Sequence, residues 1–223
     1  MRKFLRDNGL SLVWFGLFFF AFIIGQTVTG QREYNSEQRD HGRPEATYAE
    51  YLATPHFVEA TMENWESEFL QMFLFVALTA FLYQRGSAES KDPDKEEEVD
   101  RDPRQSKHKK DAPWPVRKGG AVLKVYEHSL SLVFLLLFAA CFLLHAAGGA
   151  REYNNEMSEH GSPERVTTLS YMGTSRFWFE SFQNWQSEFL AVGLMVVLSI
   201  WLRQKGSPES KPVDAPHSQT GKG

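Results

Sequence analysis

The stretch LSLVWFGLFFFAFIIGQTVTGQREYN, residues 10–35, runs from apolar to polar, and it recurs as LSLVFLLLFAACFLLHAAGGAREYN at residues 130–154. Four apolar blocks in the chain lack any Asp, Glu, Lys or Arg: Leu10–Ile24, Phe69–Tyr83, Leu130–Leu144 and Phe189–Leu202. Helices that are apolar on every side must be covered by protein or by lipid, and the intervening segments are too loop-like to form a cover. The sequence therefore predicts an all-α integral membrane protein with four transmembrane helices.

The lengths of the blocks agree with this prediction once their flanks are included. Each strictly apolar core is shorter than the ~20 residues that cross ~30 Å of hydrocarbon. Residues 9–28 are free of charge, and Trp65 and Trp185 are suited to anchor the second and fourth helices at the membrane interface. The first block is expected to be a retained span rather than a cleaved leader, because its counterpart lies in mid-chain.

Lys and Arg residues are distributed unequally among the segments that flank the blocks. The N-terminal tip, residues 85–124 and the C-terminal tail hold 18 of them, whereas the two connections that carry REYN hold 6. Cytoplasmic segments are enriched in these residues. We therefore expect an integral plasma (inner) membrane protein with both termini in the cytoplasm and both REYN segments facing outward.

The repeat extends well beyond the opening stretch. HGRPE at His41, NWESEFL at Asn64 and QRGSAESK at Gln84 return as HGSPE, NWQSEFL and QKGSPESK at an offset of 119 or 120 residues. Because each half crosses the membrane twice, the halves must be tandem, parallel two-helix repeats, and we expect them to form a four-helix bundle. The predicted domains are a first two-span repeat at 1–91, a charged disordered linker at 92–120, a second two-span repeat at 121–211 and a disordered tail at 212–223.

Each outer connection is expected to be partly helical. No Pro or Gly interrupts residues 32–41, which can prolong the first span outward until Gly42 stops the helix. An apolar stripe at i, i+4, i+7 and i+11 then predicts a second helix that begins near Thr54, with its twin beginning near Thr174. These interfacial helical segments would form an ordered extracytoplasmic cap.

Two Glu–His pairs stand on the outer segments. Glu37 with His41, and their twins Glu156 with His160, are spaced i and i+4, which places each pair on one helical face. Two such pairs facing one another can converge on a metal in a helix bundle, so a divalent metal is a candidate cofactor. The alternative is an exposed helix whose acids are solvated and whose His precedes a glycine turn, and the spacing alone favours this alternative.

Two further carboxylates stand at the edge of the apolar blocks. Glu68 and Glu188 each precede an apolar core by one residue. A carboxylate so near hydrocarbon is costly unless it is paired or faces a cavity, so these residues are candidates for an ion or proton site, closed by Arg32 and Arg151. A helix start at headgroup level, with Arg–Glu pairs joining the connections, is the plainer interpretation and is preferred.

Gln26 and His145 occupy matching positions near the outer ends of the first and third spans. We expect them to form hydrogen bonds between helices, as polar residues in membranes commonly do. A ligand role for His145 is disfavoured by the Gln at the partner position. The sequence also lacks a phosphate-binding glycine loop, a G-x-S-x-G elbow and Cys/His zinc spacing. Nucleic-acid binding is not expected, because acids offset the basic residues of the linker.

The motifs REYN, HGxPE, NWxSEFL and GSxESK, each present twice, resemble those of an uncharacterised family of bacterial multi-pass membrane proteins, classed as a domain of unknown function. The resemblance covers nearly the whole chain apart from the linker and tail, and it implies no activity, substrate or catalytic residue.

The expected function is that of a non-enzymatic inner-membrane module, structural or partner-binding. Its partners would be the lipid bilayer and a second copy or another membrane protein. The alternative is a small transporter or channel subunit, or a metal-binding membrane protein, that uses the outer Glu and His residues.

Overall fold

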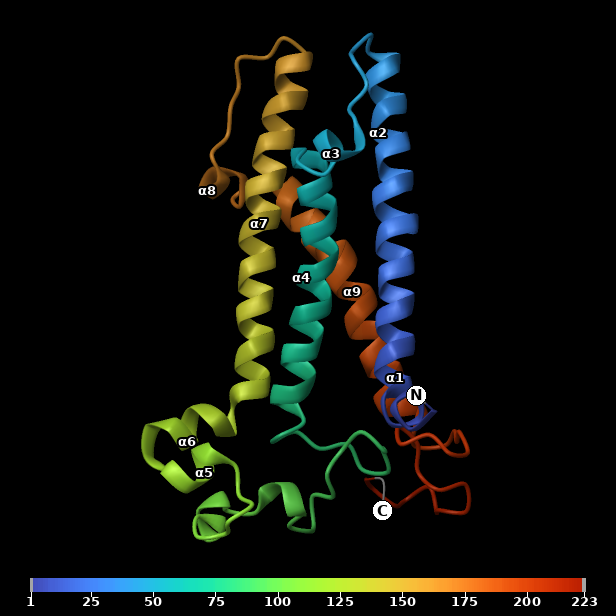
Figure 1. Cartoon of the computed structure of the whole chain (residues 1–223), viewed down its shortest axis with the longest axis vertical. Helices are drawn as coiled ribbons and strands as arrows, with labels where there is room; N and C mark the ends of the chain where they lie inside the picture. Colours follow the sequence, from blue (N-terminus) through green and yellow to red (C-terminus); the bar gives the residue numbers. More distant parts are fainter. Residues whose placement is uncertain (1, 222–223) are drawn as a thin grey trace. The chain divides into compact units, whose positions relative to one another are not determined.

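The regular elements of the protein are all helices. The computed structural model describes residues 2–221, and no strand occurs in that range. In chain order the elements are α1 (Arg2–Phe19), η1 (Phe20–Val28), α2 (Thr29–Asp40), α3 (Tyr48–Tyr51), α4 (Pro55–Leu78), η2 (Glu98–Asp100), η3 (Pro103–Ser106), α5 (Trp114–Lys118), α6 (Gly120–Glu127), α7 (Ser129–Glu159), α8 (Thr168–Tyr171) and α9 (Ser175–Leu198) (Figure 1). The all-α prediction is confirmed.

Within residues 2–221, two helical stretches are long and apolar enough to cross a membrane, judged by length and composition. They are Lys3–Asp40, which comprises most of α1 with η1 and α2, and Ser129–Glu159, which is α7. These stretches contain the first and third apolar blocks, and each continues without a break into its REYN segment (Figure 1).

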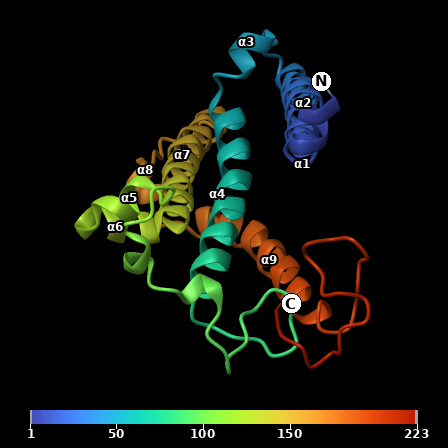
Figure 2. The same cartoon turned by 60° about the horizontal axis from the view of Figure 1, so that its bottom comes forward.

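The chain folds into two compact units, and each unit takes residues from both sequence halves. Unit 1 comprises Met1–Met62 and Leu144–Gly173, and unit 2 comprises Glu63–Leu143 and Thr174–Gly223. Helices α4 and α7 therefore contribute to both units, whereas α8 belongs to unit 1 and α9 to unit 2. The short helices α5 and α6, which follow one another in unit 2, lie in the connection between α4 and α7 (Figure 2).

The first long helix contains a π-helical segment, η1, that α7 lacks. Gly30 lies 20 residues after Leu10, whereas the matching Gly149 lies 19 residues after Leu130. A π-helix has wider turns than an α-helix, so it takes up one added residue while the helix continues on both sides. The extra residue of the first copy is thus accommodated within η1.

The predicted ends and beginnings of the outer helices are confirmed. Helix α2 ends just before Gly42, whose φ is +67°, and α7 ends just before Gly161, whose φ is +66°. Only glycine adopts such a φ at little cost, so the chain leaves both helices there. Helix α4 begins directly after Thr54, and α9 begins after Thr174, whose hydroxyl accepts a hydrogen bond from the Phe177 amide at 3.3 Å.

Helices α4 and α9 end earlier than the second and fourth apolar blocks. Each has 24 residues, and they end at Leu78 and Leu198. Only residues 69–78 and 189–198 of these blocks are helical, which corresponds to about 15 Å of apolar helix. Apolar composition did not reveal these ends, because the turns that follow contain one polar residue each, Thr79 and Ser199, and are otherwise apolar.

Candidate functional site

In unit 1, the loop of each outer segment is fastened by the Asn of its REYN motif. Asn35 donates to the Ala46 carbonyl and accepts from the Ala46 amide, both at 2.9 Å. Asn154 forms the same two hydrogen bonds with Val166, both at 2.8 Å. Since these bonds satisfy both polar groups of one loop residue, they hold each loop against its helix.

A buried tyrosine packs against a glycine beneath each loop. Tyr51 and Tyr171 are 2 % and 0 % exposed. A Cβ added at Gly30 would overlap the Tyr51 hydroxyl, and one added at Gly149 would lie 2.5 Å from Cε1 of Tyr171. Both positions therefore need glycine, so that the helix backbone can approach the tyrosine ring.

One ion pair joins the two outer segments, although they are far apart in the sequence. The Arg43 guanidinium donates to the Glu159 carboxylate. The hydrogen bond and the attraction to Glu159 raise the pKa of Arg43. Both side chains are about one-third exposed, at 32 % and 27 %, so the pair fixes the relative position of the loops more than it stabilises the fold.

The predicted Glu–His pairs lie in unit 1, on the ends of α2 and α7. Nδ1 of His41 donates to the backbone carbonyl of Glu37 at 2.8 Å, and Nδ1 of His160 donates to that of Glu156 at the same distance. Each imidazole thus caps the end of its own helix. Within residues 2–221, no group of three His, Cys, Asp or Glu side chains with mutually close ligand atoms includes any of these four. A metal at this place stays a prediction.

The other predicted site residues belong to different units. Arg32 and Arg151 are exposed side chains of unit 1. Glu68 is exposed and Glu188 is half-buried, and their carboxylates in unit 2 are close enough to interact electrostatically. Pairing of these arginines with these glutamates stays a prediction.

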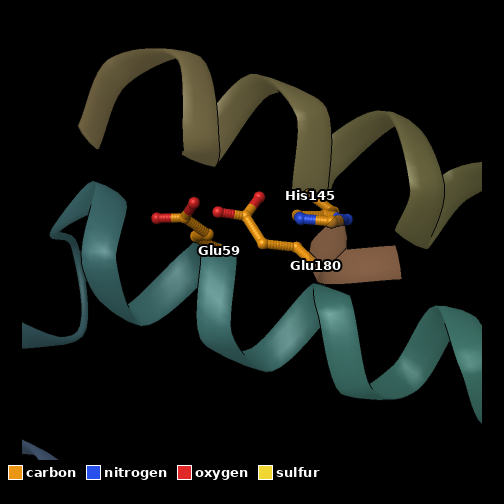
Figure 3. A group of neighbouring side chains, drawn as sticks. All are labelled: Glu59, His145 and Glu180. Carbon is orange, nitrogen blue, oxygen red and sulfur yellow. The ribbon is translucent and has the colours of Figure 1, made fainter. Parts of the chain in front are cut away.

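A buried carboxylate and a buried imidazole of unit 1 lie near each other. Glu59 projects from α4 and His145 from α7, and a carboxylate oxygen of Glu59 lies within 4.8 Å of a ring nitrogen of His145 (Figure 3). Glu59 is 8 % exposed and His145 is 0 % exposed. Glu180, the third side chain drawn in Figure 3, belongs to unit 2, where it accepts a hydrogen bond from Arg176 at 2.9 Å.

Two glycines of α7 make room for Glu59. A Cβ at Gly148 would lie 2.9 Å from the Glu59 backbone nitrogen, and a Cβ at Gly149 would lie 2.8 Å from Oε1 of Glu59. The hydroxyl of Tyr171 donates to that same oxygen at 3.4 Å. Gly148 and Gly149 therefore permit close approach of α7 to α4, and Tyr171 of α8 places its phenol beside the buried carboxylate.

The matching place of the first copy carries a neutral pair. Gln26 of η1 donates from Nε2 to the Thr61 hydroxyl of α4 at 2.8 Å. The predicted hydrogen bond between helices is thus confirmed for Gln26. Where the first copy has this amide, the second copy has the imidazole of His145, which lies near the carboxylate of Glu59.

Further carboxylates follow Glu59 along α4 in unit 2. Glu63 accepts a hydrogen bond from Gln183 at 3.1 Å, and Glu66, which is 0 % exposed, accepts one from the Trp185 indole at 3.2 Å. Glu59, Glu63 and Glu66 are spaced i, i+4 and i+7. Sequence reasoning followed the apolar stripe of this helix and Glu68, and it missed these three, although their spacing marks a shared helical face.

The chain belongs to the family described as a domain of unknown function, DUF6766, whose model matches residues 1–222. No curated protein and no solved structure matches it.

Proposed function

We propose that this member of the DUF6766 family is a non-enzymatic membrane module with four transmembrane helices, arranged as two tandem, parallel two-helix repeats. Its two outer segments, residues 29–54 and 148–173, form one ordered cap on the extracytoplasmic side of an inner membrane, and the cap is the surface that binds a partner. Both termini are cytoplasmic.

The observation that carries this proposal is the meeting of the two outer segments in unit 1. Each has the same Asn-fastened loop, and the Arg43–Glu159 ion pair joins them. Two segments more than 100 residues apart share one unit with matched bonding, as expected of a duplicated element whose copies lie on the same side of a membrane.

Helices α4 and α9 are compatible with membrane spans in spite of their polar first halves. With 24 residues each, they are about 36 Å long, which exceeds the ~30 Å hydrocarbon thickness. The carboxylates of Glu59 and Glu66 are buried within the protein, and Glu180 of α9 is paired with Arg176. Acidic groups that face protein rather than lipid are tolerated within a membrane.

A cross-linking experiment tests the shared cap. In a Cys141→Ala background, Arg43→Cys and Glu159→Cys are combined, and intact cells are treated with a membrane-impermeant bismaleimide. We expect an intramolecular cross-link, because both positions face outward and adjoin. Arg43→Cys combined with Glu98→Cys, in the linker, is the control and should not react in intact cells. Reaction of the first pair only after permeabilisation, or none at all, would refute the proposed cap.

Partner binding is tested on the same surface. Photo-reactive amino acids at positions 45 and 164, on the two exposed loops, should give discrete cross-linked bands in cells, whereas position 98 in the linker should not give the same bands. A cap that forms no cross-link at either loop would contradict the partner-binding role and leave the topology unaffected.

A second candidate is a small transporter or channel subunit. The observation that favours it is Glu66, a fully buried carboxylate on a proposed membrane helix, since ionisable groups within spans mark ion and proton pathways. Proton flux into proteoliposomes should then be abolished by Glu66→Gln. Flux equal to that of empty liposomes would refute this candidate.

A further inference from the structure

We propose that Glu59 and His145 bind a divalent transition-metal ion, with Zn²⁺ as the type case, inside unit 1. This inference goes beyond the proposed membrane module, which needs no metal, and it uses residues other than the Glu–His pairs predicted from the sequence.

The first argument is the chemistry of the two side chains. Carboxylate oxygen and imidazole nitrogen are both ligands of Zn²⁺ and related ions, at about 2.0–2.2 Å from the metal. Two ligand atoms bound to one ion at these distances are roughly 3–4 Å apart. The Glu59 oxygen and the His145 nitrogen lie within 4.8 Å of each other, which is therefore compatible with one bridging ion after small side-chain rotations.

The second argument is burial. Glu59 and His145, both residues of unit 1, are 8 % and 0 % exposed. Burying an ionised carboxylate is costly unless it is paired or binds a metal. A divalent cation neutralises Glu59 and uses the nitrogen lone pair of a neutral His145, so both groups gain from the same ion.

The third argument is the surroundings of Glu59. The Tyr171 hydroxyl, itself fully buried, donates to Oε1 of Glu59 at 3.4 Å. Hydrogen bonds from neighbours that orient a ligating carboxylate are a regular feature of metal sites. Gly148 and Gly149 leave the space that this arrangement needs, because a side chain at either position would meet Glu59.

The fourth argument is the contrast with the first copy. There, Gln26 and Thr61 form a neutral hydrogen bond of 2.8 Å. This bond is enough to join η1 to α4. The second copy keeps a hydroxyl at the position of Thr61, as Ser181, but has His145 at the position of Gln26. The ring of His145 lies near Glu59 of α4, a carboxylate that belongs to the first copy and whose counterpart in the second copy is Phe179.

The test uses full-length protein in detergent, with its purification tag removed and with metal stripped by a chelator. Zn²⁺ is titrated by calorimetry, and Co²⁺ is added in parallel because its visible absorption reports coordination by the protein. We expect one tight site per chain. Glu59→Gln and His145→Gln should each weaken Zn²⁺ binding more than about 100-fold, since the loss of even an outer partner of a ligand costs 10- to 100-fold. His145→Gln installs the side chain that the first copy has at this position.

The matched control is His41→Gln combined with His160→Gln, which removes the exposed imidazoles of the outer segments and should leave the tight site unchanged. Circular dichroism of each variant checks that the helices persist. Absence of a tight site in the wild type overturns the proposal. It is also overturned if folded Glu59→Gln and His145→Gln proteins bind Zn²⁺ as the wild type does, or if the control variant alone loses the site. None of these outcomes bears on the cap, which is tested by cross-linking.

Discussion

Replacement of Lys211 by Ala should release the C-terminal tail from unit 2. Lys211 is 1 % exposed, and its ammonium donates to the backbone carbonyls of Gly86, His217 and Gln219. The last two bonds measure 3.0 and 2.8 Å. One lysine thus joins the GSAES loop that follows α4 to residues 216–219 of the tail, and the Gly221 amide adds a 2.9 Å bond to the carbonyl of Ser87.

The size of the effect follows from these bonds and from the cost of burying a charge. A hydrogen bond to a charged group contributes about 1.5–3 kcal/mol, and Lys211 makes three of 3.0 Å or less, with a longer fourth one of 3.5 Å to the carbonyl of Pro216. Ordering the side chain costs up to ~2 kcal/mol, and removing an ammonium from water costs several kcal/mol more. Burial accordingly lowers the pKa of Lys211. The net contribution should be close to that of one bond, about 2 kcal/mol, which is about a 30-fold change in the tail's opening equilibrium.

Hydrogen exchange of the full-length protein, followed by mass spectrometry, measures this opening. In Lys211→Ala, peptides that cover residues 212–221 and 84–90 should exchange about 30-fold faster, while peptides from unit 1 should be unchanged. The control is Lys205→Ala, which should have no effect. Lys205 is an exposed lysine in the segment after α9 that also contains Lys211. Equal protection in both variants would refute the reasoning. Free exchange of the tail in the wild type would do so as well, and would agree with the sequence-based prediction of a disordered tail.

Three further predictions concern the cap. Gly30→Ala should lower the stability of unit 1 by about 1–3 kcal/mol in thermal unfolding, because the new Cβ overlaps the Tyr51 hydroxyl. Adding Tyr51→Phe should restore most of that loss, and an equally unstable double variant would contradict the steric cause. Hydrogen bonds from Thr47 lower the pKa of Glu50 below its ordinary value of 4.5. Since the folded pKa is then below the unfolded one, this stabilisation is present above pH 4.5 and is lost as the pH falls through the folded pKa. The NMR signal of the Thr47 amide should therefore titrate below pH 4.5, and a midpoint at or above that value would show that the capping bond is absent. Arg43→Gln should speed hydrogen exchange in the loops at 41–47 and 160–166, and this effect should vanish at high salt; an effect that persists in salt would point to packing rather than charge.

The features that could be predicted from the sequence are those with a local cause. Helix α2 stops at Gly42 and α4 begins after Thr54, because a glycine that adopts positive φ and a hydroxyl that caps free amides act within one turn. The all-α class was also predictable, because an apolar block is a property of the local sequence. The end of α4 at Leu78 was not predictable in this way, since Thr79 is followed by further apolar residues and no Gly or Pro marks the change.

The Glu59–His145 pair was missed because its meaning depends on which faces of α4 and α7 turn inward. In the sequence, His145 matches Gln26 of the first copy, and this mismatch was taken as evidence against a ligand role for His145. In the structure, the same mismatch supports such a role. The Asn-fastened loops and the Tyr–Gly contacts are alike in the two copies, so they account for the shared architecture of the cap.

The difference between Gln26 and His145 is therefore not needed for that architecture. A duplicated unit can satisfy its structural contacts with one kind of residue pair and is free to place different chemistry at one of the two equivalent positions. In this chain the substitution exchanges a neutral amide for an imidazole near Glu59, one turn before Gly148 and Gly149, where a Cβ would meet Glu59. Restoring the first-copy residue with His145→Gln should consequently leave the helices and the cap in place and remove only the binding of metal.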